Sequence, residues 1–168
     1  TTHAARPAVH DRCPRCELLT QLGLQFTIAA PDVDESVNGR EDPVAYVRRL
    51  AHDKAAAVTA APDALVIAAD TTVEIDGDIL AKPEDAADAA RMLRRLSART
   101  HRVHTGVALR LGDTTVVDVI TSLVTFVPLT SAAIEWYVGT GEPLDKAGAY
   151  AIQGAGGVFV QRVQGSVS

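Results

Sequence analysis

The sequence predicts a single α/β domain spanning residues 1–168, with a mixed sheet flanked by helices. Patterns typical of strands and of helices alternate along the chain, which is the order expected of an α/β fold. No internal repeat, low-complexity linker or break in composition divides the chain, and its length suits one domain with a substantial core. Aromatic residues make up only 4% of the chain, so we expect the core to consist of Val, Leu, Ile and Ala.

Composition and charge exclude several classes of protein. The net charge of −5 provides no basic surface for nucleic acid, although local lysines and arginines could still attract a small anion. No apolar run is long enough to cross a bilayer, and TTHAARPAVHDR lacks the apolar core of a secretion signal. The two cysteines, Cys13 and Cys16, cannot form a disulfide framework. We therefore expect a cytoplasmic protein that binds neither nucleic acid nor membrane.

The first 60 residues predict two helices with a short strand and a polar loop between them. Leucines follow helical spacing over 17–25, where a glycine is a typical helix end. The segment FTIAAP at 26–31 is typical of a short strand, and the polar segment 32–42 of a loop. Asp42 followed by proline favours a helix start, and apolar residues at helical spacing extend that helix to about residue 60.

A hairpin and a further helix are predicted next. Residues 65–75 form the first clear strand. Asp76 and Gly77 are favoured in a two-residue type I′ turn, so Ile79-Leu80 should pair with the end of this strand. Pro83 is expected to open the helix that follows, which carries an apolar stripe.

The last third of the chain predicts two long strands, one helix and a glycine-rich tail. Strands over 101–111 and 114–127 are joined by Gly112-Asp113. Thr130 is expected to cap a helix that ends on glycine. The remaining residues should form a loop, a glycine-rich turn and a strand.

Asp70 is the first candidate catalytic residue. It follows the uncharged run Leu65–Ala69, so we place it at the end of a buried strand. Acidic residues at the ends of elements are often caps or turn residues. Ligands of α/β sheets nevertheless gather at strand ends, where a rigid strand can present a base or a metal ligand. Both interpretations are open on local chemistry alone.

Two lysines and an acidic segment are further candidates. Lys82 follows the returning strand of the hairpin, and Lys54 lies at the edge of the apolar stripe of the second helix. An ammonium group suits phosphate oxygens, but both lysines could equally be solvated surface residues. Asp32, Asp34 and Glu35 could supply oxygen ligands for Mg²⁺ or Mn²⁺, or could form a plain acidic loop.

The cysteines and histidines argue against a zinc or redox centre. Cys13 and Cys16 form a C-x-x-C motif, but no second such pair or histidine pair at zinc spacing accompanies it. A redox dithiol would also need a preceding strand, which the polar HAARPAVHD does not provide. His101 and His104 are an odd number of residues apart on a predicted strand, so they should point to opposite faces.

The C-terminal segment EPLDKAGAYAIQG could contact a nucleotide. Its glycines allow close backbone approach. The Gln153 amide can both donate and accept hydrogen bonds, which suits the edge of a nucleobase. A plain glycine-rich turn between strands is the alternative. Because no Walker or G-x-G-x-x-G motif is present, this interpretation depends on the segments taken together.

Taken together, the segments resemble the Maf family of nucleoside-triphosphate pyrophosphatases from about Cys13 to Ser168. The matching strings are, in chain order, ELLTQLGLQF, DVDES, YVRRLAHDKA, AADTTV, DGDILAKP, AARMLRRLSARTHRVHTGVAL and, the most specific, EPLDKAGAYAIQG. The resemblance implies an elongated mixed sheet flanked by helices, with a central cleft as in inosine-triphosphate pyrophosphatases, and often a homodimer. It also implies Mg²⁺- or Mn²⁺-dependent hydrolysis of a nucleoside triphosphate to the monophosphate and pyrophosphate.

The same resemblance implies a role for each candidate residue. Asp70 would accept a proton and, with Glu35, hold the metal. The substrate-binding residues would be Arg15, Lys54, Thr71, Lys82 and Gln153. A threonine directly after the catalytic aspartate, with IQG later in the chain, is similar to the branch that acts on dTTP and UTP.

The chain departs from the family pattern at both ends. Where the family has S-x-S-P-R-R-x-E-L-L, this chain has D-R-C-P-R-C-E-L-L, which lacks the serines and one arginine, and no apolar strand precedes it. The family also continues beyond the position of Ser168. We therefore expect an atypical N-terminus and a truncated C-terminus. The altered loop keeps a second hypothesis open, a non-catalytic nucleotide-binding protein with a regulatory role in septum formation.

Overall fold

The computed structural model describes residues 14–166, and the chain forms two compact units whose boundary lies between Ala29 and Ala30. The first unit contains helix α1 (Pro14–Gln21), and Gly23 follows it with a positive φ of 71°. The strand predicted over 26–31 is wrong, because these residues lie in neither helix nor strand. A short apolar segment becomes a strand only when another strand pairs with it. The single-domain organisation stays a prediction.

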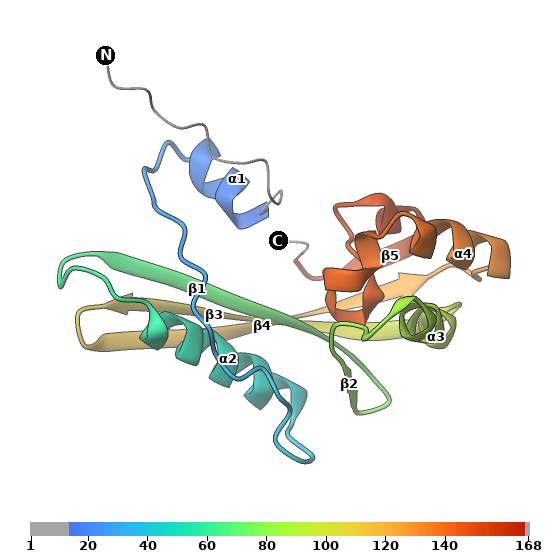
Figure 1. Cartoon of the computed structure of the whole chain (residues 1–168), viewed down its shortest axis with the longest axis horizontal. Helices are drawn as coiled ribbons and strands as arrows, with labels where there is room; N and C mark the ends of the chain where they lie inside the picture. The colour runs from blue at the N-terminus through green and yellow to red at the C-terminus, as the bar shows by residue number, and fades with distance from the viewer. Residues whose placement is uncertain (1–13, 167–168) are drawn as a thin grey trace. The chain divides into compact units, whose positions relative to one another are not determined.

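The second unit is built on a five-stranded sheet in the order β2-β1-β3-β4-β5 (Figure 1). Its strands are β1 (Leu65–Ile75), β2 (Asp78–Leu80), β3 (Thr100–Leu111), β4 (Thr114–Phe126) and β5 (Val160–Gln164). All pairings among the described strands are antiparallel, so the prediction of a mixed sheet is wrong for this part of the chain. Tight turns join β1 to β2 and β3 to β4, which makes these pairs antiparallel. The pairs β1–β3 and β4–β5 are joined by longer connections, and they are antiparallel as well.

Both predicted hairpins are confirmed. Asp76 and Gly77 have φ of 57° and 83°, as a type I′ turn requires, and β2 pairs with Val73–Ile75 at the end of β1. Gly112, with φ of 56°, turns the chain between β3 and β4. Each of these two long strands ends within one residue of its predicted bounds.

Helix caps decide where the helices of the second unit begin. Asp42 caps α2 (Pro43–Ala57) and Thr130 caps α4 (Ser131–Gly139), each accepting hydrogen bonds from backbone N–H groups as predicted. Helix α3 (Ala86–Leu96) begins three residues after Pro83, because the Asp85 carboxylate accepts the Asp88 N–H and so supplies the N-cap. The tail contains three short 3₁₀ helices, Glu142–Asp145, Ala147–Ala149 and Ala155–Phe159. Within residues 14–166, no helix has the length and apolar character needed to span a bilayer.

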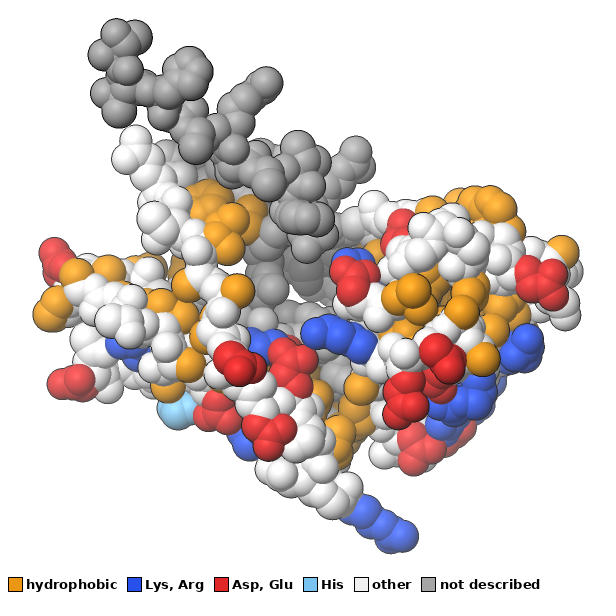
Figure 2. Space-filling view, in the orientation of Figure 1, with side chains coloured by type: hydrophobic (Ala, Val, Ile, Leu, Met, Phe, Trp, Pro, Cys, Tyr) orange, Lys and Arg blue, Asp and Glu red, His pale blue; other side chains and the backbone are white. Residues whose placement is uncertain are grey.

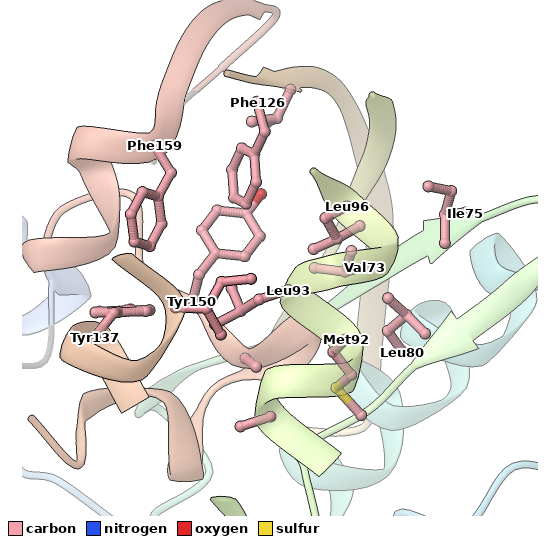
Figure 3. Close-up of a cluster of buried hydrophobic side chains, with 14 residues drawn as sticks. Val73, Ile75, Leu80, Met92, Leu93, Leu96, Phe126, Tyr137, Tyr150 and Phe159 are labelled. Carbon is pink, nitrogen blue, oxygen red and sulfur yellow. The ribbon is translucent and has the colours of Figure 1, made fainter. Parts of the chain in front are cut away.

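Helices cover both faces of the sheet, at different ends of it (Figure 1). Helix α2 packs on the face that carries Val66 and Ala108. Helices α3 and α4 and the tail pack against the opposite face, which carries Val73 and Phe126. The expectation of a purely aliphatic core is wrong, because four aromatic residues, Phe126, Tyr137, Tyr150 and Phe159, lie in this second cluster (Figure 3).

Candidate functional site

Asp70 lies in the middle of β1 rather than at its end. The β-branched residues Thr71, Thr72 and Val73 continue the strand through the carboxylate, because such residues suit a pleated sheet. Asp70 is paired across the sheet with Gly106 of β3. Its side chain is 12% exposed and points to the face that α2 covers. The predicted strand over 65–75 is confirmed, and the placement of Asp70 at a strand end is therefore wrong. Its direct partner, Lys54, comes from a helix.

Helix α2 reaches Asp70 because the residue paired with Asp70 has no side chain. A Cβ atom on Gly106 would lie 2.3 Å from the carbonyl oxygen of Val47 and 3.3 Å from the Ala51 Cβ atom. The first distance is far below any ordinary contact, so only glycine permits this approach. The helix then runs on for about two turns and brings Lys54 to the Asp70 carboxylate.

Four charged side chains from four segments form one network. The Lys54 ammonium lies 2.6 Å from Asp70 Oδ1 and 2.6 Å from Glu35 Oε1. Lys82, just after β2, donates to Glu35 Oε2 at 3.2 Å. The Tyr46 hydroxyl donates to the Glu35 carbonyl oxygen at 2.8 Å, which fastens the acidic loop to α2. On the face drawn in Figure 2, acidic and basic side chains lie next to one another rather than in separate patches of one sign.

Burial and ion pairing act in opposite directions on the pKa values of this network. Burial raises the pKa of Asp70 above its usual value, and the hydrogen bond from Lys54 only partly offsets it. Burial by itself would lower the pKa of the Lys54 amine, but its bonds to Asp70 and Glu35 outweigh burial and raise it. The hydrogen bond from Lys54 lowers the pKa of Glu35. Burial thus favours the protonated form of Asp70, whereas the hydrogen bond from Lys54 favours the charged form of Glu35.

The two carboxylates could share a cation. Glu35 and Asp70 each place one oxygen 2.6 Å from the same ammonium nitrogen, so these oxygens are at most twice that distance apart. Among residues 14–166, no three acidic, histidine or cysteine side chains converge into a metal site. Mg²⁺ is commonly held by one or two carboxylates together with substrate phosphates and water. The pair fits that mode of binding, in which the substrate supplies further ligands.

Thr71 lies on the face of β1 opposite Asp70, and Gln153 lies in the tail of the chain. Side chains alternate along a strand, so Thr71 points to the face opposite Asp70, where its hydroxyl lies 3.0 Å from that of Thr105. Gln153 is exposed in the glycine-rich turn that precedes the last 3₁₀ helix. Thr71 and Asp70 therefore do not share a face of the sheet. The role of Thr71 in recognition of the base stays a prediction.

The remaining candidates are Arg15, Cys13 and the acidic loop before α2. Arg15 belongs to α1 in the first unit, and its side chain lies outside the described residues, as does Cys13. Asp34 accepts the Ser36 N–H at 2.9 Å and so shapes the loop that carries Glu35. The structure thus joins Glu35, Lys54 and Asp70 with Lys82, and leaves the phosphate-binding role of Arg15 a prediction.

Sequence reasoning overlooked Gly106 and Tyr46, which build the site without being charged. A glycine inside a strand pattern is a known indication of close backbone approach, so Gly106 could have been found. His101 and His104 point to opposite faces as predicted, His101 Nε2 toward the Tyr150 hydroxyl at 2.7 Å and His104 Nδ1 toward that of Thr121 at 2.8 Å. Neither histidine belongs to the network.

Two lysines that alternate with two carboxylates, supplied by a helix, a strand and two loops, define a class of site suited to polyphosphate substrates. A family model described as "Maf-like protein" matches residues 13–168. The chain belongs to the Maf family.

Curated relatives match almost the whole chain. A dTTP/UTP pyrophosphatase of Anaeromyxobacter dehalogenans (strain 2CP-C) is 54% identical over 170 residues, covering 98% of this chain and 86% of that protein. One from Myxococcus xanthus is 53% identical, covering 92% and 79%. One from Salmonella typhimurium is 49% identical, covering 90% and 78%. All three carry the same name.

Proposed function

We propose that the chain hydrolyses dTTP and UTP to the monophosphate and pyrophosphate, as an enzyme that removes non-canonical or excess nucleotides. The observation that carries the proposal is the network of Glu35, Lys54, Asp70 and Lys82. It occurs in a member of a family whose relatives, at about half identity, are named dTTP/UTP pyrophosphatases. The network supplies both a base and positive charge, which hydrolysis of a phosphoanhydride requires.

In this proposal, substrate phosphates compete with the carboxylates for the two lysines. Lys54 and Lys82 turn toward phosphate oxygens, which carry more charge than a carboxylate. Asp70 then loses the hydrogen bond that lowers its pKa, while its burial remains. The freed carboxylate accepts a proton from the water that attacks the α-phosphorus. Substrate binding would thus prepare the base.

Glu35 and Asp70 would also hold a divalent cation, Mg²⁺ or Mn²⁺, together with phosphate oxygens. The support is that one cation, the Lys54 ammonium, already reaches both carboxylates. When bound, such an ion neutralises phosphate charge that would repel the nucleophile. Removal of divalent ions by EDTA should therefore abolish turnover, and added Mg²⁺ or Mn²⁺ should restore it.

We further propose that Thr71 and Gln153 select the base and that Arg15 binds phosphate. Because Thr71 points away from Asp70, the nucleotide would have to extend to the other face of β1 to meet it. The cleft and the homodimer implied by the family resemblance, and the cytoplasmic location expected from the composition, are proposals of the same kind. Sedimentation velocity of the purified chain tests the homodimer.

Pyrophosphate release from dTTP, UTP, CTP and GTP, with Mg²⁺ or Mn²⁺, tests the function. We expect turnover of dTTP and UTP that Asp70→Asn reduces by about a hundredfold or more. The matched control is Asp113→Asn, the same change in the exposed turn between β3 and β4, which should retain activity. Full activity of Asp70→Asn would contradict the mechanism. Binding of dTTP without turnover of any nucleotide would favour the non-catalytic, regulatory alternative.

A further inference from the structure

Glu142 is a partly buried carboxylate outside the charged network, and it accepts three hydrogen bonds. The Tyr137 hydroxyl donates to Oε1 at 2.7 Å, and the Gly156 N–H donates to the same oxygen at 3.2 Å. The Ala155 N–H donates to Oε2 at 3.0 Å. Burial would raise the pKa of Glu142, but these bonds outweigh it and lower the pKa. The side chain is therefore a charged acceptor at neutral pH.

Tyr137 provides the second attachment of the same turn. Its ring is fully buried and meets Phe159 edge to face at 5.2 Å (Figure 3). Its hydroxyl donates to Glu142 and also accepts the Ala151 N–H at 3.2 Å. Because the ring is anchored in the core, this hydroxyl has a fixed position.

The turn over residues 151–156 is thus held at both ends, and its glycines permit the close fit. A Cβ atom on Gly154 would lie 2.4 Å from Glu142 Oε1, and one on Gly156 would lie 2.6 Å from the Tyr137 hydroxyl oxygen. Either side chain would force the turn away from its attachments. Gln153 lies between the two held ends and is exposed.

We propose that Glu142 and Tyr137 are positioning residues that clamp the turn over residues 151–156 and thereby hold Gln153 in place for recognition of the nucleobase. The inference rests on the proposed function, since it assigns a purpose to that substrate contact. A turn held only by its own backbone would spread Gln153 over several orientations. Holding it in advance spares that ordering cost on binding.

The test is a double-mutant cycle between Glu142 and Gln153, read by steady-state kinetics on dTTP. Glu142→Gln keeps the shape but replaces one carboxylate oxygen by an amide NH₂ group, which cannot accept the backbone N–H group of Ala155 or of Gly156. We expect KM to rise on the order of tenfold, as for the loss of a charge-assisted hydrogen bond, with kcat changed much less. In the Gln153→Ala background, the same substitution should leave KM unchanged, because the clamped side chain is already absent.

Glu135→Gln is the matched control, because Glu135 lies exposed on α4 and takes no part in the clamp. It should leave KM unaltered. A second readout needs no substrate: hydrogen exchange at the Ala155 and Gly156 amides should speed up in Glu142→Gln and stay unchanged in the control. Tyr137→Phe removes a single hydroxyl, and it replaces Glu142→Gln if the latter fails to fold, with hydrogen exchange then measured at the Ala151 amide.

The possible outcomes distinguish failure of the clamp from failure of the proposed function. Wild-type turnover of dTTP with an unchanged KM in Glu142→Gln would overturn the clamp and leave the proposed function intact. An equal rise in KM with and without Gln153 would overturn it too, since Glu142 would then act through another group. Absence of wild-type turnover would overturn the proposed function and with it the role of the clamp in base recognition.

Discussion

Substitution of Gly106 by alanine should move α2 away from the sheet and so disrupt the charged network. The added Cβ atom would lie 2.3 Å from the Val47 carbonyl oxygen, whereas ordinary carbon–oxygen contacts are about 3.3 Å or longer. The helix must therefore withdraw by about 1 Å. A backbone oxygen cannot turn aside as a flexible side chain could, so the strain cannot be relieved locally.

Both stability and activity should fall in Gly106→Ala. Forcing an extra methyl group into a packed interface costs about 1–3 kcal/mol, which outweighs the gain of up to about 1 kcal/mol expected when alanine replaces a strand glycine. A shift of about 1 Å at a catalytic group can reduce the rate by about a hundredfold. The shift would also lengthen the 2.6 Å contact between Lys54 and Asp70.

Urea unfolding followed by circular dichroism measures the first effect, and pyrophosphate release from dTTP measures the second. Gly139→Ala at the end of α4 is the matched control, because a Cβ atom there would have no neighbour within 4 Å. Its free energy of unfolding should stay the same or rise by up to about 1 kcal/mol. If Gly106→Ala were as stable and as active as the wild type, close approach of α2 could not be what places Lys54.

Three further outcomes follow from individual contacts. Burial lowers the pKa of His101 from 6.5 to about 4, so between these pH values the unfolded chain binds a proton and the folded chain does not. The free energy of unfolding should therefore fall by about 3 kcal/mol as the pH drops from 6.5 to about 4. Urea titrations should show a weaker pH dependence in His101→Phe, and an equal pH dependence would refute the assignment. The Arg110 guanidinium donates to two carbonyl oxygens at the end of α2, those of Ala55 and Val58, so Arg110→Met should lower stability by about 1–3 kcal/mol, whereas Arg162→Met at an exposed site should not. Thr71→Ala should leave the thermal midpoint nearly unchanged but alter the ratio of kcat/KM between dTTP and CTP, and an unaltered ratio would remove Thr71 from base recognition.

Local hydrogen bonding explains which elements could be predicted. Asp42 and Thr130 accept N–H groups two or three residues away, so these caps depend on nearby sequence only. The turn at Asp76-Gly77 likewise needs only two residues that tolerate positive φ. The segment 26–31 has strand composition as well, but strand formation requires a partner, and composition does not show whether one is present.

For the candidate site too, the sequence revealed some features and not others. The residue types that suit phosphate chemistry, among them Glu35, Lys54, Asp70 and Lys82, were identifiable from the sequence and from the family resemblance. Their pairing was not, because Lys54 meets Asp70 only where Gly106 lets a helix approach a strand. The opposite orientations of Asp70 and Thr71 follow from strand alternation, which applies because β1 continues through both residues.

The sequence by itself therefore determined the caps, the hairpin turns, the family and the chemical identity of the candidate residues, because each depends on neighbouring residues or on a linear motif. Only the tertiary structure decided that the described sheet is antiparallel, that α2 covers Asp70, and that Glu142 holds a turn more than eight residues away. These features depend on contacts between segments distant in sequence. Packing sets such contacts through the space that each side chain, or its absence at a glycine, leaves to its neighbours.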